Sequence, residues 1–233
     1  MNITGQIFPL NMALNSVDDQ YKGCREKMAE LVKTKYMKRE MSNPESDFAH
    51  AWKDAEKKYK PPGENLTNNH SIAIYVYTTS ADRKDKREYQ NQTYNWYSIH
   101  FLLTDAIQIL KKTQNKCYDT YRGTKLEYIK NVRNKKVRFG SFTSSIDRNI
   151  AKFFGTVSCF ENHTCEGAEV TKYSKLSREK EVLIPPYETF KVTAVRTERR
   201  QKDLWCDTVF TLETSSVTFL KMAIGPLGGA RGA

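Results

Sequence analysis

Two short segments in the second half of the chain combine residue types that could hold a substrate. In residues 121–124, Arg122 closes an apolar strand, and Gly123 lets the backbone approach whatever the arginine binds. Residues 139–145 end in a cluster of hydroxyl side chains that includes Ser144. Each segment also has a plain structural explanation: an ion pair at a strand end, and a hydroxyl-capped turn before a helix.

A third segment carries two carboxylates, Glu179 and Glu181, directly before the apolar run 182–186. Residues at i and i+2 of a strand point to the same side, so both carboxylates could face one cleft. Mutual repulsion and partial burial would then tune them for acid–base work or for stabilising a cation. The alternative is a pair of solvated carboxylates on a polar strand face.

Helices are expected to dominate the first half of the chain. Apolar residues recur every three to four positions over residues 17–32, behind Ser16 as a predicted N-cap. The same spacing appears between Asn43 and Pro61 and again over residues 94–112, where the stripe is long enough for a principal core helix.

Strands are expected to dominate the second half. The run 72–77 alternates between apolar side chains and predicts one early strand buried on both faces. From Cys117 onward the apolar segments are short and bounded by turn residues. They predict strands at 117–122, 137–142, 156–160, 168–173, 181–184, 189–195, 207–212 and 217–220.

This pattern predicts an α+β fold in which a helical lobe packs on a mostly antiparallel, sandwich-like β core. At 233 residues the chain suits a single domain over residues 1–224, with the helical lobe at about 1–112 and the β core at about 113–224. Residues 225–233 are small and glycine-rich, and we expect a flexible tail there.

Composition excludes several classes of protein. With 39% hydrophobic residues the chain is too rich in core material to be disordered. No run approaches the roughly 18 apolar residues of a spanning helix, and the N-terminus lacks the pattern of a signal peptide, so we expect any such signal to have been removed. The net charge of +11 would attract nucleic acid, anionic membranes or phosphate-bearing ligands.

Sequons and cysteines indicate an oxidising, extracellular compartment, in which nucleic acid is not an expected partner. Five N-glycosylation sequons begin at Asn2, Asn65, Asn69, Asn91 and Asn162. The five cysteines form no Cys-x-x-Cys pair and the four histidines are scattered, which favours long-range disulfides and predicts no metal. The odd number leaves one thiol free or paired with another molecule.

Taken in order, the three chemical segments resemble the R-S-E-x-E signature of the vertebrate ecto-ADP-ribosyltransferases, relatives of the clostridial C2- and C3-like toxins. Three further segments resemble family motifs: DDQYKGC at 18–24, VRFG at 137–140 and EVLIPP at 181–186. The resemblance covers essentially the whole chain. It implies the ADP-ribosyltransferase fold with an NAD cleft.

The resemblance also implies an activity and a role for each site residue. The family transfers ADP-ribose from NAD to arginine side chains of target proteins and releases nicotinamide. Glu181 would stabilise the ribose cation, Arg122 would hold the NAD diphosphate and Gly123 the nicotinamide amide. Ser144 would bind the nicotinamide ribose, and Glu179 would accept the proton of the acceptor arginine.

The family likewise implies disulfides Cys24–Cys206 and Cys117–Cys165, with Cys159 as the spare. The loop at 172–178 departs from several relatives, because its aromatic residue is Tyr173 and the positions nearer Glu179 are basic or aliphatic. We expect a monomer that is secreted or held at the outer cell surface by a lipid anchor, with no other membrane contact.

Three alternatives stay open at this point. Water could be the acceptor, which would make the protein a secreted NAD glycohydrolase. A catalytically silent display or adhesion protein would keep the fold without the activity. A heparin or nucleic-acid binder would use the basic runs at 83–87 and 196–202.

Overall fold

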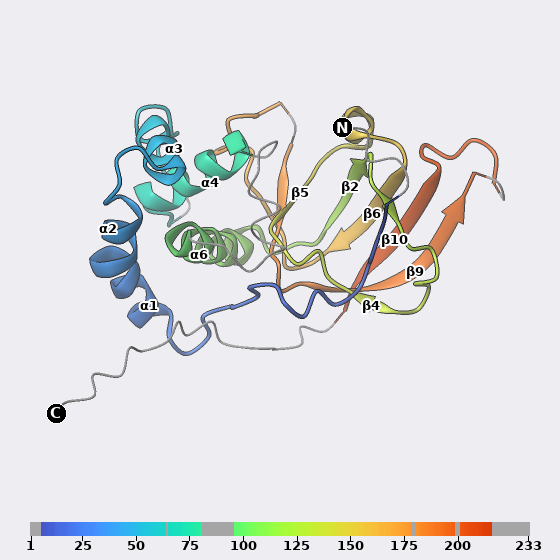
Figure 1. Ribbon diagram of the computed structural model, residues 1–233, viewed down its shortest axis with the longest axis horizontal. Helices are drawn as coiled ribbons and strands as arrows, with labels where there is room; N and C mark the ends of the chain where they lie inside the picture. The colour runs from blue at the N-terminus through green and yellow to red at the C-terminus, as the bar shows by residue number, and fades with distance from the viewer. Residues whose placement is uncertain (1–5, 64, 81–95, 179, 199–200, 216–233) are drawn as a thin grey trace.

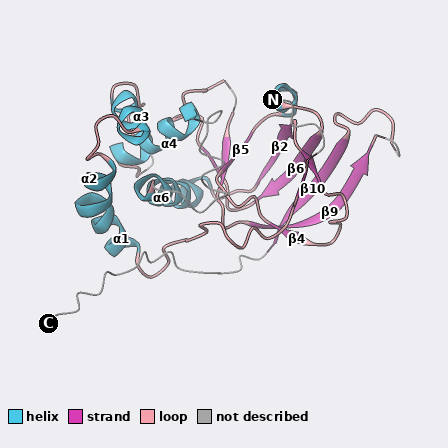
Figure 2. Cartoon of the chain, viewed as in Figure 1, coloured by secondary structure: helices cyan, strands magenta, loops and turns pink. Residues whose placement is uncertain are grey.

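The computed structural model describes residues 6–63, 65–80, 96–178, 180–198 and 201–215. Helices gather on one side of the molecule and the strands of the largest sheet lie on the other, with strand β5 between them (Figures 1 and 2). This arrangement confirms the predicted α+β class. Among the described residues, no helix combines the length and apolar character needed to cross a membrane.

The helices span a range from one turn to five. In chain order they are α1 (Arg25–Leu31), the π-helical segment η1 (Val32–Tyr36), α2 (Met37–Glu40), α3 (Asp47–Glu56), α4 (Asn68–Ser80), α6 (Tyr97–Gln114), α7 (Arg148–Ala151) and the 3₁₀ turn η2 (Lys152–Phe154).

The first helix begins later than predicted. Ser16 caps no helix, because its hydroxyl donates to the carbonyl of Ala13 (2.7 Å) in a turn. Tyr21 and Gly23 then adopt left-handed backbone angles (φ 54° and 78°), which no helix can contain. The helix therefore starts at Arg25 and continues through η1 and α2 to Glu40.

The second and third predicted helices are confirmed as α3 and α6. Ser46 caps α3, since its hydroxyl accepts a hydrogen bond from the amide of Ala49 (3.1 Å). The residues Phe48, Trp52 and Ala55 form the buried stripe of this helix. In α6, Asn115 ends the helix in a left-handed conformation (φ 42°).

The predicted strand at 72–77 is wrong, because this segment forms the middle of helix α4. Residues 72–76 are all buried, so the helix has no polar face in that stretch to give it a 3.6-residue period. A fully apolar run of this length is compatible with either a buried strand or a buried helix turn. Here the neighbouring helices α3 and α6 cover it.

Three sheets make up the β half. A five-stranded sheet has the order β2-β6-β10-β9-β4, a three-stranded sheet the order β5-β8-β7, and β1 pairs with β3. Pairing is antiparallel except in β6–β10 and β1–β3. The strands are β1 (Ile7–Phe8), β2 (Tyr118–Thr124), β3 (Glu127–Tyr128), β4 (Lys136–Val137), β5 (Thr143–Ser145), β6 (Ser158–Thr164), β7 (Ala168–Glu169), β8 (Val182–Ile184), β9 (Thr189–Thr197) and β10 (Thr208–Ser215).

Most predicted strands appear with shifted ends, although β7 keeps only two residues of the predicted 168–173. The predicted strand 137–142 is split, because β4 ends at Val137 and Gly140 then takes a left-handed angle (φ 72°) before β5. The predicted strand 217–220 and the expected tail lie outside the described residues. The first described segment also departs from the expected lobe boundary, since Leu10 packs in the core of the β half.

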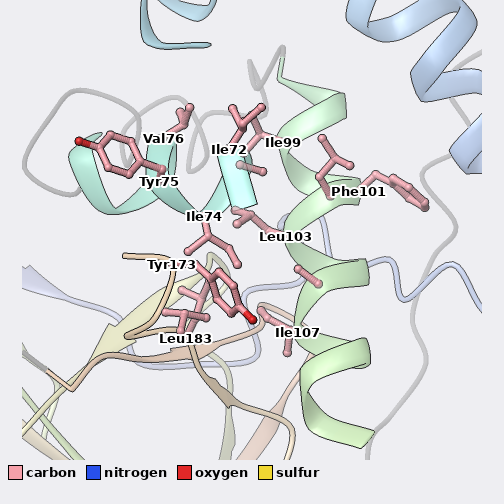
Figure 3. Packing of buried hydrophobic residues seen from close by; sticks show 14 of the residues in the cluster. Ile72, Ile74, Tyr75, Val76, Ile99, Phe101, Leu103, Ile107, Tyr173 and Leu183 are labelled. Carbon is pink, nitrogen blue, oxygen red and sulfur yellow. The ribbon is translucent and has the colours of Figure 1, made fainter. Parts of the chain in front are cut away.

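One hydrophobic cluster joins the helices to the three-stranded sheet. Figure 3 shows Ile74 of α4 and Leu103 and Ile107 of α6 packed near Tyr173 and Leu183. Leu183 lies in the middle of β8, so the helical half contacts the strand that follows the predicted glutamates. The helices therefore fix the position of this strand through apolar contact.

The expected Cys24–Cys206 disulfide is wrong, whereas Cys117–Cys165 is confirmed, with Cα atoms 4.2 Å apart. Cys206 pairs with Cys159, the residue expected to be spare (Cα–Cα 6.0 Å). These two cysteines share one buried cluster beside β6 and β10, whereas Cys24 packs against the helical cluster at the start of α1. Cys24 is therefore the free thiol.

The predicted glycosylation of Asn162 is also wrong. Asn162 is only 2% exposed in β6, between β2 and β10, where an attached glycan would have no space. Asn65 and Asn69 are exposed, so glycosylation there stays a prediction. Asn2 and Asn91 lie outside the described residues.

Candidate active site

Strand register brings the three chemical segments together at the junction of two sheets. In the β5–β8 pair Ser145 lies opposite Val182, the residue after Glu181. The next residue, Ile146, exchanges both backbone hydrogen bonds with Tyr121, each 2.9 Å long. The residue before Arg122 and the residue after Glu181 thus pair with adjacent residues of one segment, although they are far apart in sequence.

Arg122 lies half-buried on β2, opposite Phe160 of β6. Burial raises the pKa of the neighbouring Tyr128, and the charge of the Arg122 guanidinium partly offsets this rise. An arginine side chain presents several N–H donors in a planar fork. It therefore offers a fork-shaped donor next to the sheet junction.

Gly123 is a position where no side chain would fit. A Cβ atom there would lie 2.3 Å from the carbonyl oxygens of both Ala151 and Gly155. The turn formed by α7 and η2 can press against β2 only because this residue is glycine. The sequence predicted a close backbone approach at Gly123, and its tightest contacts are with the chain's own turn.

The turn is held in place by one arginine. Arg148 pairs with Glu161 (3.6 Å) and lies over the rings of Tyr121 and Trp205, at 5.8 and 5.5 Å from their centres. Asp147 caps α7 by accepting from the amide of Asn149 (2.9 Å), which confirms the short helix predicted before Phe154. These contacts fix the turn on the strand that carries Arg122.

Ser144 lies in β5 with its backbone opposite Leu183 of β8. Ser144 therefore lies in the short strand between the segment that contains Arg122 and the segment that contains Glu181. The role assigned to its side chain stays a prediction.

Glu181 is 2% exposed and lies directly before β8. Its Oε2 accepts a hydrogen bond from the hydroxyl of Ser174 (2.9 Å), which is itself completely buried. The Ser174 hydroxyl also accepts from the amide of Leu176 (2.9 Å), and the amide of Lys175 donates to Thr78 of α4 (3.1 Å). A loop anchored on a helix therefore sets the orientation of this carboxylate.

The predicted same-side arrangement of the two glutamates rests on an extended backbone between positions 179 and 181. Lys180 instead adopts a left-handed angle (φ 47°), and β8 begins only at Val182. The i, i+2 rule of strands therefore does not support that arrangement. Glu179 itself lies outside the described residues.

Two features of this region were not predicted from the sequence. Ser174 gave no signal, because a serine in a basic loop resembles any surface hydroxyl until its partner is known. Phe153 and Phe154 are exposed (86% and 44%) on the turn that presses against Gly123. Adjacent phenylalanines in a short helix read as core residues, so only the structure shows that they face solvent.

Comparison with known families matches residues 10–210 to NAD:arginine ADP-ribosyltransferase. The chain is 30% identical to NAD(P)(+)--arginine ADP-ribosyltransferase 1 of Gallus gallus, over 96% of this chain and 75% of that protein. It is 30% identical to the GPI-linked NAD(P)(+)--arginine ADP-ribosyltransferase 1 of Mus musculus, over 82% of this chain and 67% of that protein.

Solved structures give the same assignment. The eucaryotic mono-ADP-ribosyltransferase ART2.2 superposes with a TM-score of 0.75 at 27% identity, over 92% of this chain and 97% of its own. A single-residue variant of that enzyme in complex with NADH gives the same TM-score at 26% identity, over 94% of this chain and all of its own. The sheet junction with Arg122 and Glu181 is thus set in a fold that solved structures share, and the chain belongs to the NAD:arginine ADP-ribosyltransferase family.

Proposed function

We propose that this protein transfers ADP-ribose from NAD to arginine side chains of target proteins and releases nicotinamide. The observation that carries the proposal is that residues 143–146 pair with β8, directly after Glu181, and with Tyr121, directly before Arg122. A cation and a buried carboxylate on two segments that meet at this strand suit a substrate that has a diphosphate at one end and a developing ribose cation at the other.

The first step breaks the bond between the ribose C1′ atom and the nicotinamide nitrogen, and the electron pair leaves with nicotinamide. The ribose gains cationic character, which the Glu181 carboxylate stabilises from beside the sugar. Arg122 holds the diphosphate, and the Gly123 backbone binds the nicotinamide amide. Ser144 binds the nicotinamide ribose and helps to keep the sugar aligned with Glu181.

The second step forms a bond between C1′ and a nitrogen of the acceptor arginine. A guanidinium is protonated at neutral pH and is a poor nucleophile until a base accepts its proton. Glu179 is the proposed base. The loop that precedes it is anchored to α4 through Lys175, so the acceptor would approach over a rigid segment.

Exposed aromatic rings extend the proposed site. Phe153 and Phe154 lie on the turn against Gly123, whose backbone is proposed to bind the nicotinamide amide. Flat heteroaromatic rings stack on such side chains, with a contribution of about 1–3 kcal/mol per ring. We therefore assign these two residues to a ring of NAD. Phe153→Ala should weaken NAD binding at least about 5-fold, whereas Leu14→Ala, at another exposed apolar position, should not.

The same proposal places the protein outside the cell. One relative is named an ecto-enzyme and another GPI-linked, and the Cys117–Cys165 and Cys159–Cys206 disulfides suit an oxidising compartment. Its partners would be NAD and arginine-containing proteins. A lipid anchor would provide the only membrane contact.

A paired assay tests the function. The protein is incubated with labelled NAD, with and without the arginine analogue agmatine, and nicotinamide release and agmatine labelling are followed together. Wild-type protein should label agmatine. Glu181→Gln should lose both signals while still binding NAD, and Glu179→Gln should keep nicotinamide release while losing labelling.

Glu30→Gln is the matched control, because Glu30 is exposed on α1, far along the chain from the site. Nicotinamide release without agmatine labelling in the wild type would show that water is the acceptor. Absence of both signals would leave a protein that keeps only the fold, and the proposal would be wrong.

A further inference from the structure

The two disulfides differ in their access to solvent. Cys159 and Cys206 are 0% and 4% exposed inside a hydrophobic cluster. Cys117 is exposed at the start of β2, and Cys165 is half-buried. A reductant in water therefore reaches Cys117–Cys165 first, and this bridge can open while the other remains closed.

The register of β2 and β6 places a histidine and an aspartate beside the exposed bridge. Tyr118 lies opposite Thr164 and Asp119 opposite His163, so the next pair outward is Cys117 and Cys165. Side chains two positions apart on a strand share a face. The ladder therefore brings Cys117 and Asp119 of one strand onto the same face as His163 and Cys165 of the other, at the edge of the five-stranded sheet.

The ligand atoms of Cys117, His163 and Cys165 lie within 4.8 Å of one another. In a tetrahedral zinc site with Zn–S bonds of about 2.3 Å, two sulfur atoms stand about 3.8 Å apart. Opening the disulfide moves the sulfur atoms apart in the direction that such a site requires. Small side-chain rotations would then suffice to bring all three ligands to one ion.

Asp119 supports the histidine in the way that metal sites use. Its Oδ1 lies 2.7 Å from Nδ1 of His163, so Nε2 is the nitrogen that we assign to the metal. A carboxylate that holds the far nitrogen fixes the ring and makes it a better ligand.

We propose that reduction of Cys117–Cys165 creates a site for a thiolate-binding divalent metal such as Zn²⁺, with Cys117, Cys165 and His163 as protein ligands. A dithiol or phosphine reductant supplies the two electrons, and two protons from water complete the two thiols. Metal binding displaces both protons, because the thiolate is the ligand. Water completes the tetrahedron.

The metal site would take the place of the disulfide as a link between two parts of the fold. Cys117 directly precedes the strand that carries Arg122, and Cys165 lies between β6 and β7, the latter paired with β8. The disulfide joins these parts covalently, and the metal would join them again after reduction. Spacing in the sequence does not indicate this cluster, because Cys117 is 48 positions from Cys165.

Cobalt spectroscopy tests the site directly. Cys24 is first alkylated in the oxidised protein, and the exposed disulfide is then opened with a phosphine, which provides no thiolate of its own. Addition of Co²⁺ should give a sulfur-to-cobalt charge-transfer band and the visible bands of tetrahedral cobalt, and Zn²⁺ should remove both. Peptide mapping should find Cys117 and Cys165 reduced and Cys159–Cys206 intact.

Variants separate the site from incidental thiolate binding. His163→Ala should weaken cobalt binding by at least about 100-fold, and Asp119→Asn by about 10- to 100-fold. His50→Ala, at an exposed histidine on α3, should have no effect. The double variant Cys117→Ser/Cys165→Ser should show no charge-transfer band.

Several outcomes would overturn the proposal. These are the absence of a charge-transfer band in the reduced protein, equal affinity in His163→Ala and wild type, and reduction of the buried bridge before the exposed one. Loss of the folded circular dichroism spectrum on reduction that neither Co²⁺ nor Zn²⁺ reverses would overturn it as well.

Discussion

Arg138 and Asp18, which are 120 residues apart in sequence, form a buried ion pair. Their side chains are 1% and 4% exposed. The guanidinium also donates to the carbonyl oxygens of Met12 (2.7 Å) and Ala13 (3.3 Å), so each of its nitrogen atoms has an acceptor. Two of the motif segments that carried the family resemblance, 18–24 and 137–140, therefore meet at one contact.

Replacement of Asp18 by Asn should destabilise the fold by about 3–5 kcal/mol, because it leaves the Arg138 charge buried without its counter-ion. Urea unfolding followed by fluorescence measures the loss. Glu30→Gln, on an exposed surface, should change the free energy of unfolding by less than about 0.5 kcal/mol. A cost below about 1 kcal/mol for Asp18→Asn would mean that the pair contributes little.

Ser174→Ala should lower kcat by on the order of 10- to 100-fold with little change in KM for NAD, because the Glu181 carboxylate loses the hydroxyl that orients it. Steady-state nicotinamide release measures both parameters. Ser177→Ala in the same loop is the control, since Ser177 is exposed. A rise in KM at constant kcat would assign Ser174 to substrate binding instead.

Gly123→Ala should displace the turn that carries Phe153, because the new Cβ would overlap two carbonyl oxygens. We expect a loss of about 1–3 kcal/mol in stability and a clear loss of NAD affinity, measured by thermal unfolding with and without NAD. Gly63→Ala meets only the Tyr173 hydroxyl at 3.5 Å and should be neutral. Equal behaviour of the two variants would contradict the packing argument.

Glu40 should make stability fall as pH rises. Burial under the start of α6 raises the pKa of Glu40 from 4.5 to about 7, although hydrogen bonds from Ser98 and Tyr97 and the nearby Arg39 charge partly offset this. Between these two pH values the unfolded chain releases the proton first, so stability is lost over this window by up to about 3 kcal/mol.

The comparison of wild type with Glu40→Gln isolates this effect. Burial lowers the pKa of His100 from 6.5 to about 4, and that group acts in the opposite direction, since its stabilisation is lost as pH falls from 6.5 to 4. The variant should therefore gain stability from pH 4 to 6.5, where the wild type stays nearly level. Parallel curves for the two proteins would exclude a role for Glu40.

The helices that could be predicted are those in which polar residues interrupt the apolar ones at helical spacing. In α3 and α6 this spacing is a sufficient local signal, although the first helical residue is not where it was expected in α3 and no side chain caps α6. Residues 72–76 of α4 are all buried, so the sequence there has no polar face and no helical periodicity. The start of α1 was missed because the charge of Asp18 is used by Arg138 and the left-handed angle at Tyr21 stops a helix, and both are tertiary effects.

The site residues were predicted from motif resemblance more than from physics. Register then explains why Arg122 and Glu181 meet, which spacing alone could not show. Ser174 was out of reach because its importance depends on a partner seven positions away across a non-helical, non-extended loop. The Cys159–Cys206 pairing was missed because connectivity depends on which strands become neighbours, and sequence alone allows several pairings.

The central strand of the five-stranded sheet is β10, the last strand that the structure describes. During synthesis, β6 and β9 therefore emerge before β10, the strand that pairs with both of them, and each has an unpaired edge until β10 is made. Open edges of this kind pair readily with other chains. A ribosome that stopped before Thr208 would release a product prone to aggregate, so the sheet is protected only after β10 has emerged.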